Sequence, residues 1–135
     1  MDVLSIIKAD HEAILADLAA LTQATGVKAR REQLTALAPK LEVQFKLEES
    51  YLFPEVEGVA EETIPVTKAG LANISTMRRR TKALTRLFAK PAAEQAGSGS
   101  KVEELSELMH KHFGAVQEHL MPKIRQHIRT EERED

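Results

Sequence analysis

Apolar side chains recur at alternating steps of three and four residues along the first part of the chain. Between about Asp2 and Ala24, this series contains one polar member, His11, in its middle. The spacing places all of its members on one stripe of an α-helix, as is typical of a helix packed in a bundle. Gly26 just beyond it is a helix stop signal. The predicted inward positions of this first helix are Leu4, Ile7, His11, Ile14, Leu18 and Leu21.

The next segment, over about residues 28–53, has a comparable stripe that ends in polar residues. We expect a kink or an early break at Pro39 inside it, because proline has no backbone N–H and crowds the preceding turn. Pro54 ends the regular part. The predicted inward positions are Leu34, Leu37, Leu41, Gln44, Glu48 and either Tyr51 or Leu52.

A third helix is predicted from about Thr63 to Phe88. Thr63 is suited to the N-cap position and Pro65 to the first turn. The pattern leaves two alternatives for the face of this helix that points inward. One consists of Gly70, Asn73, Met77 and Leu84, and the other of Leu71, Ile74, Thr81 and Phe88.

Residues 90–99 form the clearest linker, because Pro, Gly and Ser are concentrated there. Ser100 and Glu103 then match a capping box and predict the start of a fourth helix. We expect Pro122 to interrupt this helix and the helix to fray after Ile128. Residues 131–135 are expected to form a disordered polar tail. Four helices with short connections and no strand pattern predict an all-α, antiparallel up-down-up-down four-helix bundle over residues 1–130. The inward positions of the fourth helix are Leu105, Met109, His112, Val116 and either His119 or Leu120.

The composition excludes several functional classes. The chain has no cysteine, which rules out disulfides, thiolate metal sites and cysteine nucleophiles. Its net charge of −2 shows no overall bias toward nucleic acid or anionic lipid. No stretch is long and apolar enough to span a bilayer, and the N-terminus does not resemble a signal peptide. We therefore expect a cytoplasmic protein with no nucleic-acid or membrane partner.

Polar residues on the otherwise apolar stripes are the informative feature, because burying them is costly unless they find partners. His11, Glu48 and His112 lie on three different predicted helices, at positions that come level in an antiparallel bundle. Two imidazoles and one carboxylate are ligands suited to non-haem iron, manganese or zinc. The alternative is a hydrogen-bonded polar core, because a lone histidine on an apolar face is more often a core residue than a ligand.

Two segments of the chain repeat each other. Residues 44–54 and 112–122 carry Phe, Leu and Pro at identical offsets, which indicates a pseudo-repeated helical hairpin. Together with Asp10-His11-Glu12, these segments resemble the signatures of the hemerythrin-like (HHE) family, the second of which is His-Phe-x-x-Glu-Glu-x-x-Leu-Phe-Pro. The resemblance covers nearly the whole chain. It implies a four-helix bundle that binds a carboxylate- and oxo-bridged pair of irons and handles dioxygen, nitric oxide, peroxide or iron sensing.

The resemblance assigns metal-ligand positions to His11, Glu48 and His112. Neutral residues stand at the other ligand positions, where they do little to compensate the charge of two iron ions, so the resemblance does not extend to a standard diiron-oxo centre. These replacements are Gln44 for a histidine, Gln117 for a bridging carboxylate, and Asn73 and Met77 for the usual His-x-x-x-His pair of the third helix.

Three functional hypotheses follow. In the first, His11, Glu48 and His112 hold one non-haem iron or similar ion that binds or senses a small diatomic or peroxide ligand, with Tyr51 and His119 as candidate further ligands. In the second, haem binds through His11, His112 or Met77, which requires room beside small residues such as Gly70, Ala72 and Gly114. In the third, the chain is a metal-free structural or interaction domain. An open metal position would also permit catalysis, and the sequence leaves that question open.

A basic band lies on the third predicted helix, formed by Arg78, Arg79, Arg80, Lys82 and Arg86. We expect it to occupy a solvated face or to pair with the acidic helices. The alternative is that Arg80 points inward and neutralises Glu48 or an anionic cofactor.

Overall fold

The structure is a computed structural model that describes the backbone of residues 3–134 and the side chains of residues 3–127. Within that range the chain is helical and contains no strand, which confirms the predicted fold class. The first and third rods are single helices, whereas the second and fourth continue through a π-helical turn into a further α-helix. The elements are α1 (Val3–Gln23), α2 (Val27–Leu47), a first π-turn (Glu48–Leu52), α3 (Phe53–Val59), α4 (Ile64–Phe88), α5 (Ser98–Ala115), a second π-turn (Val116–Leu120) and α6 (Met121–Glu134).

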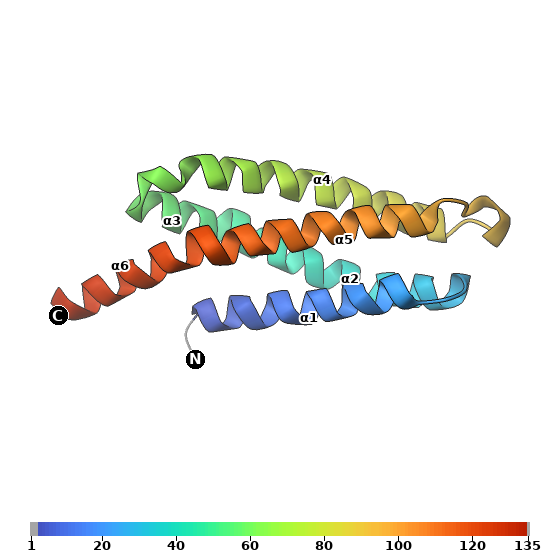
Figure 1. Ribbon diagram of the computed structural model, residues 1–135, viewed down its shortest axis with the longest axis horizontal. Helices are drawn as coiled ribbons and strands as arrows, with labels where there is room; N and C mark the ends of the chain where they lie inside the picture. Colours follow the sequence, from blue (N-terminus) through green and yellow to red (C-terminus); the bar gives the residue numbers. More distant parts are fainter. Residues whose placement is uncertain (1–2, 135) are drawn as a thin grey trace.

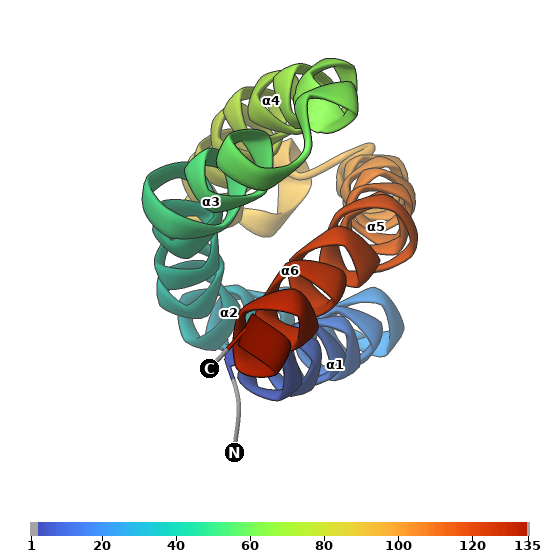
Figure 2. The same ribbon diagram turned by 90° about the vertical axis from the view of Figure 1, so that its left-hand side faces the viewer.

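Four rods run antiparallel along the long axis of the molecule (Figure 1). Viewed from the end, they stand at the corners of a square, and consecutive rods are neighbours (Figure 2). The helix contacts agree, since α1 packs on α2 and α5, and α4 packs on the same two helices. Therefore α1 lies diagonally opposite α4, and α2 lies diagonally opposite α5. A side chain that crosses the interior from α2 thus meets α5. None of the described helices is long and apolar enough to cross a membrane.

The core is formed by the apolar stripes that the sequence predicts. All six predicted inward positions of α1 are buried, including His11. On α2 and α5 the predicted stripes are likewise buried as far as the π-turns. Each fully buried leucine or isoleucine contributes roughly 1.5–3 kcal/mol relative to an exposed one, so these stripes supply most of the drive for assembly.

The inward face of α4 combines the two predicted alternatives. Asn73 is only half-buried and Leu71 is 41% exposed, so neither alternative is right as a whole. The sequence pattern was ambiguous because three members of the true stripe are threonine or glycine, which give no apolar signal. The stripe repeats every three or four residues as Thr67, Gly70, Ile74, Met77, Thr81, Leu84 and Phe88.

Two of the predicted helix signals are wrong, and a third is right in its position. Helix α2 continues through Pro39, which is exposed, so the predicted early break is wrong. Helix α5 begins at Ser98, after Gly97 in a left-handed conformation with φ 81°, so Ser100 does not cap it. Ser98 is buried and accepts a hydrogen bond from Arg30. Thr63 is the N-cap residue of α4 and Pro65 lies in its first turn, as predicted, although the hydroxyl of Thr63 donates to the carbonyl of Ala60 and makes no capping bond.

The linker before α5 is more ordered than its composition indicates. Residues Ala92–Glu94 form a 3₁₀ turn, and the side chain of Gln95 is buried. The Nε2 atom of Gln95 donates to the carbonyls of Lys90 at 2.7 Å and Phe88 at 3.4 Å. These bonds tie the connection to the end of α4, so α4 and α5 are held in register at this end of the bundle.

Pro122 does not interrupt the fourth rod, contrary to the prediction. The second π-turn leads directly into α6, whose backbone is helical as far as Glu134, past the position where fraying was expected. The side chains beyond residue 127 and the whole of residue 135 lie outside the described residues. The predicted polar tail over residues 131–135 therefore stays a prediction.

Candidate functional site

The two π-turns occupy corresponding places in the repeated segments. In the first, the N–H of Phe53 donates to the carbonyl of Glu48, and in the second the N–H of Met121 donates to the carbonyl of Val116. Both turns end just before the proline of the repeat, where an ordinary helix would lose a hydrogen-bond donor. Single π-turns inside α-helices are frequent at functional sites. Here each turn widens its helix beside the polar interior.

Glu48 and His112 form a buried pair across the diagonal of the bundle. The Nε2 atom of His112 lies 2.8 Å from Oε1 of Glu48. Both side chains are almost fully buried, with 1% and 0% exposure. The second carboxylate oxygen of Glu48 is also buried, and it has no hydrogen-bond partner among the described residues. An unpartnered buried carboxylate oxygen is costly. This half of the interior therefore contains an unused acceptor next to an imidazole.

His11 is held by two carboxamide side chains. Its Nε2 atom lies 3.0 Å from the amide group of Gln44 on α2, and its Nδ1 atom lies 3.1 Å from that of Gln117 in the second π-turn. A neutral imidazole has one donor and one acceptor, and a carboxamide can present either its oxygen or its NH₂ group. Both glutamines approach the ring with Nε2, so one of the two carboxamides must turn its oxygen toward the ring for both hydrogen bonds to form. We call this arrangement the carboxamide clamp.

The surroundings of His11 keep its imidazole neutral. Burial and, to a lesser degree, the charge of His112 lower the pKa of His11 to about 4. The ring also stacks on Phe113, with a centroid separation of 4.0 Å and an interplanar angle of 13°. Because both ring nitrogens are hydrogen-bonded and one face is covered, His11 has no free lone pair for a metal ion while the clamp is closed.

Tyr51 and His119 were candidate further ligands, and both lie outside the polar interior. Tyr51 is 40% exposed, and His119 is exposed as well. In both rods the stripe returns to the interior after a step of four residues, counted from Glu48 and from Val116. The residues that come back to the core are Leu52 and Leu120, which are 0% and 1% exposed. For the same reason the alternatives at these two positions are decided in favour of leucine.

A pocket of about 370 Å³ between α4 and α5 reaches His112 from the outside. Asn73 lines this pocket and is half-buried. Met77, four residues further along α4, is fully buried in the core. Gly70 forms part of the inner wall, and a Cβ atom there would lie 2.7 Å from the ring of Phe53 and 3.5 Å from Cε1 of His112. The absence of a side chain at Gly70 therefore lets Phe53 pack close to His112.

The residues present do not fit the pair of irons that the resemblance implies. Among the described residues, no group of three or more His, Asp or Glu side chains is arranged to hold a metal ion. The structure brings Glu48 and His112 together, but it does not assemble them with His11 into the predicted trio. Two irons need several charged or imidazole ligands, whereas this interior offers one carboxylate, and the clamp occupies one of its two imidazoles.

The second hypothesis required space for haem beside Gly70, Ala72 and Gly114, and it stays a prediction. Ala72 is exposed and Phe53 packs against Gly70, but Gly70 also lines the pocket beside His112, and a Cβ atom at Gly114 would meet nothing within 4 Å. The interior next to His11 is filled by the ring of Phe113.

Sequence reasoning missed the two phenylalanines that shape the site. Phe113 stacks on His11, and Phe53 packs edge-on to His112 with a centroid separation of 6.4 Å. A signal was available, because Phe113 stands at a position that repeats Phe45, and Phe53 belongs to the Leu-Phe-Pro end of the second signature. The motif alone does not show that these rings pack against the histidines.

Comparison with known proteins agrees with this architecture. The family model described as the hemerythrin HHE cation binding domain matches residues 2–135. No curated protein and no solved structure matches the chain. Because the family match extends over practically the entire sequence, the chain belongs to the hemerythrin HHE cation binding domain family.

Proposed function

We propose that the protein binds a single divalent cation through Glu48 and His112, with iron as the expected ion. The observation that carries this proposal is the buried Oε2 atom of Glu48, which has no partner among the described residues and lies beside an imidazole. A cation would satisfy that oxygen and neutralise the carboxylate. Carboxylate oxygen and imidazole nitrogen are ligands that iron, manganese and zinc share.

The separation of the two donor atoms also supports a shared ion. Oε1 of Glu48 and Nε2 of His112 are 2.8 Å apart. Two adjacent ligands on an ion with bonds of about 2.0–2.2 Å lie roughly 3 Å from each other. An ion could therefore replace the proton between them with little movement of either side chain.

The proposed ion has few protein ligands, so most of its coordination positions stay open to water or to a small molecule. The pocket between α4 and α5 is the route by which such a molecule would arrive, because His112 forms part of its wall. We expect the natural ligand to be small, such as dioxygen, nitric oxide or peroxide. When bound, the cation would supply positive charge and open positions, while the chain excludes bulk water and fixes the donors.

The carboxamide clamp limits the site to one ion in this proposal. Both nitrogens of His11 are bonded to neutral glutamine side chains. A second ion on His11 would have to break at least one of these bonds, and the described residues offer no second buried carboxylate to compensate its charge.

Isothermal titration of the metal-free protein with iron(II), under anaerobic conditions, tests the proposal. We expect a stoichiometry of one ion per chain. His112→Ala and Glu48→Gln each remove one proposed ligand, and each should abolish the binding heat. His110→Ala serves as the matched control, because His110 is an exposed histidine on the same helix. A stoichiometry of two, or unchanged binding in His112→Ala, would contradict the proposal.

A metal-free role is the second candidate function, and one observation favours it. The hydrogen bonds of His11 and the Glu48–His112 pair already give most of the interior polar atoms a partner. In this case the interior is a hydrogen-bonded network that holds three helices together, and a buried water satisfies the remaining oxygen of Glu48. The absence of any binding heat for iron, manganese or zinc, with a melting temperature unchanged by chelator, would select this candidate.

A further inference from the structure

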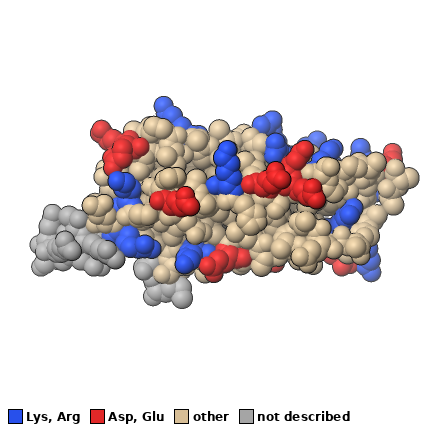
Figure 3. Space-filling model, in the orientation of Figure 1, with Lys and Arg blue, Asp and Glu red and all other residues tan. Residues whose placement is uncertain are grey.

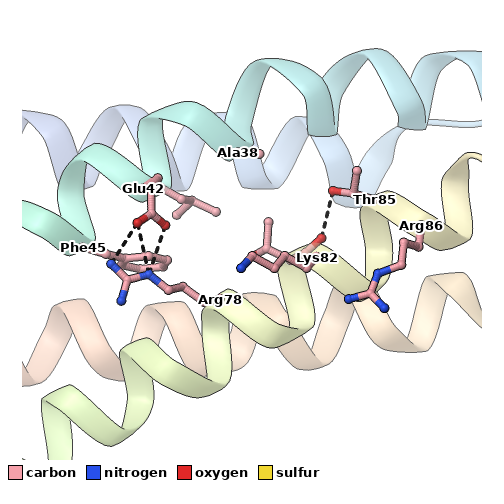
Figure 4. Close-up of a pocket in the computed structure, with 9 residues that line it drawn as sticks. Ala38, Glu42, Phe45, Arg78, Lys82, Thr85 and Arg86 are labelled. Atoms are coloured by element: carbon pink, nitrogen blue, oxygen red, sulfur yellow. Dashed lines mark hydrogen bonds and ion pairs between the residues drawn. The ribbon is translucent and has the colours of Figure 1, made fainter.

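A groove outside the polar interior lies between α2 and α4 (Figure 4). It encloses about 370 Å³, within the range of small-molecule sites in proteins. Its floor is apolar, since Leu41 and Phe45 are each only 1% exposed. Thr81 and Thr85 lie along its α4 side, and both hydroxyls donate to backbone carbonyls of their own helix. The groove is therefore an apolar channel with its charges at the rim.

The charges at one end of the groove are already paired. Arg78 donates to Glu42 from Nε and Nη2, with distances of 3.0 Å and 2.9 Å, and to Glu49 from Nη1 at 2.9 Å. Its guanidinium lies 5.6 Å from the centroid of the Phe45 ring. Hydrogen bonds to Glu49 and then Glu42 raise the pKa of Arg78, so it stays a cation. This part of the basic band pairs with an acidic helix, as predicted, and Arg80 is exposed instead of pointing inward.

The charges at the other end have no partner in the part of the chain that the structure describes. Lys82 and Arg86 both line the groove from α4, and they are four residues apart, which places them on the same side of the helix. Neither makes a hydrogen bond or ion pair with any described residue, whereas Arg78 makes several. Lys and Arg side chains recur along the upper edge of the molecule, where α4 lies (Figure 3). The groove thus has a neutralised end at Phe45 and a positive end at Lys82 and Arg86.

We propose that this groove binds a small amphipathic anion, namely a carboxylate with a medium-length hydrocarbon chain. The carboxylate would lie between Lys82 and Arg86, and the chain would run over Leu41 toward Phe45. If the anion bound in the reverse direction, its carboxylate would meet Glu42 and Glu49. The charges of the groove therefore also fix the direction of binding. This site is separate from Glu48 and His112 and does not depend on the proposed cation.

Titration with decanoate, followed by amide chemical shifts of isotopically labelled protein, tests this proposal. We expect saturable shifts at Leu41, Thr81 and Thr85. Decanol should bind at least about tenfold more weakly, because it lacks the charge that the two cations recognise. Lys82→Glu should weaken decanoate binding by a similar factor. Lys68→Glu changes the net charge equally at an exposed position of α4 outside the groove, and it should leave binding unchanged.

Several results would overturn the proposal. Equal affinity for decanol would show that the groove does not recognise an anion. An unchanged affinity in Lys82→Glu, or an equal loss in Lys68→Glu, would show that Lys82 has no specific role. Shifts confined to the pocket beside His112 would place the ligand elsewhere. Concentration-dependent self-association that Lys82→Glu abolishes would identify a second copy of the chain as the occupant.

Discussion

Protonation of His11 should destabilise the folded protein at mildly acidic pH. The pKa of His11 is lowered in the fold to about 4 from the ordinary value of 6.5, mainly by burial. The unfolded chain therefore binds more protons than the folded chain between these two values. Stability from the neutral ring is fully present above about pH 6.5 and is lost as the pH falls toward about 4.

The magnitude follows from the width of that window. One unit of pKa difference corresponds to about 1.4 kcal/mol, so lowering the pH from about 7.5 to about 4.5 should cost between about 2 and 3 kcal/mol through His11 alone. Other groups also titrate in this range, so the contribution of His11 has to be isolated. His11→Gln is the suitable variant, because an amide can still bond to Gln44 and Gln117 but cannot be protonated.

Urea denaturation followed by circular dichroism gives the free energy of unfolding of both proteins at a series of pH values. We expect the wild-type protein to lose about 2–3 kcal/mol more than His11→Gln over this interval. Equal losses in the two proteins would refute the reasoning, because His11 would then titrate alike in the folded and unfolded chains. A smaller loss in the wild-type protein would show that the clamp stabilises the protonated ring.

Three further predictions concern packing and surface charge. Gly70→Ala should destabilise the protein by about 1–3 kcal/mol in thermal unfolding, because the new methyl group meets Phe53 at 2.7 Å. Gly114→Ala is the control, because its methyl group meets nothing within 4 Å and should stabilise α5 by about 0.5–1 kcal/mol. Destabilisation by both substitutions would contradict this prediction. Arg78→Met should cost about 1 kcal/mol at low salt and less at high salt, since its ion pairs are partly exposed, and a loss independent of salt would point to packing instead. Gln95→Ala should cost about 1 kcal/mol and increase amide hydrogen exchange in the linker, because the carbonyl of Lys90 loses its side-chain donor, whereas that of Phe88 keeps its bonds from Arg31. Unchanged exchange there would show that Gln95 does not order the linker.

The fold was predictable because apolar spacing reports burial directly. The stripe of α1 was predicted residue by residue, since leucine and isoleucine mark every inward position except His11. The face of α4 was not, because Thr67, Gly70 and Thr81 are buried without an apolar signal. A residue pattern shows which face is inward only where the inward residues are apolar.

The sequence predicted which polar residues are buried in the site, but not the hydrogen bonds between them. The stripes correctly placed His11, Gln44, Glu48 and His112 in the interior. The clamp was not foreseen, because two glutamines from different helices reach the same imidazole only through the three-dimensional arrangement. The π-turns were missed as well, because the spacing of the inward residues left both Tyr51 and Leu52 open after Glu48 and gave no sign of an i→i−5 hydrogen bond.

Anomalous diffraction from crystals grown with iron(II) would test the central claim most directly. We expect a single peak within bonding distance of Glu48 and His112, with His11 still bonded to both glutamines. Two peaks in the interior, or one peak bonded to His11 with the clamp open, would contradict the proposed single-ion site.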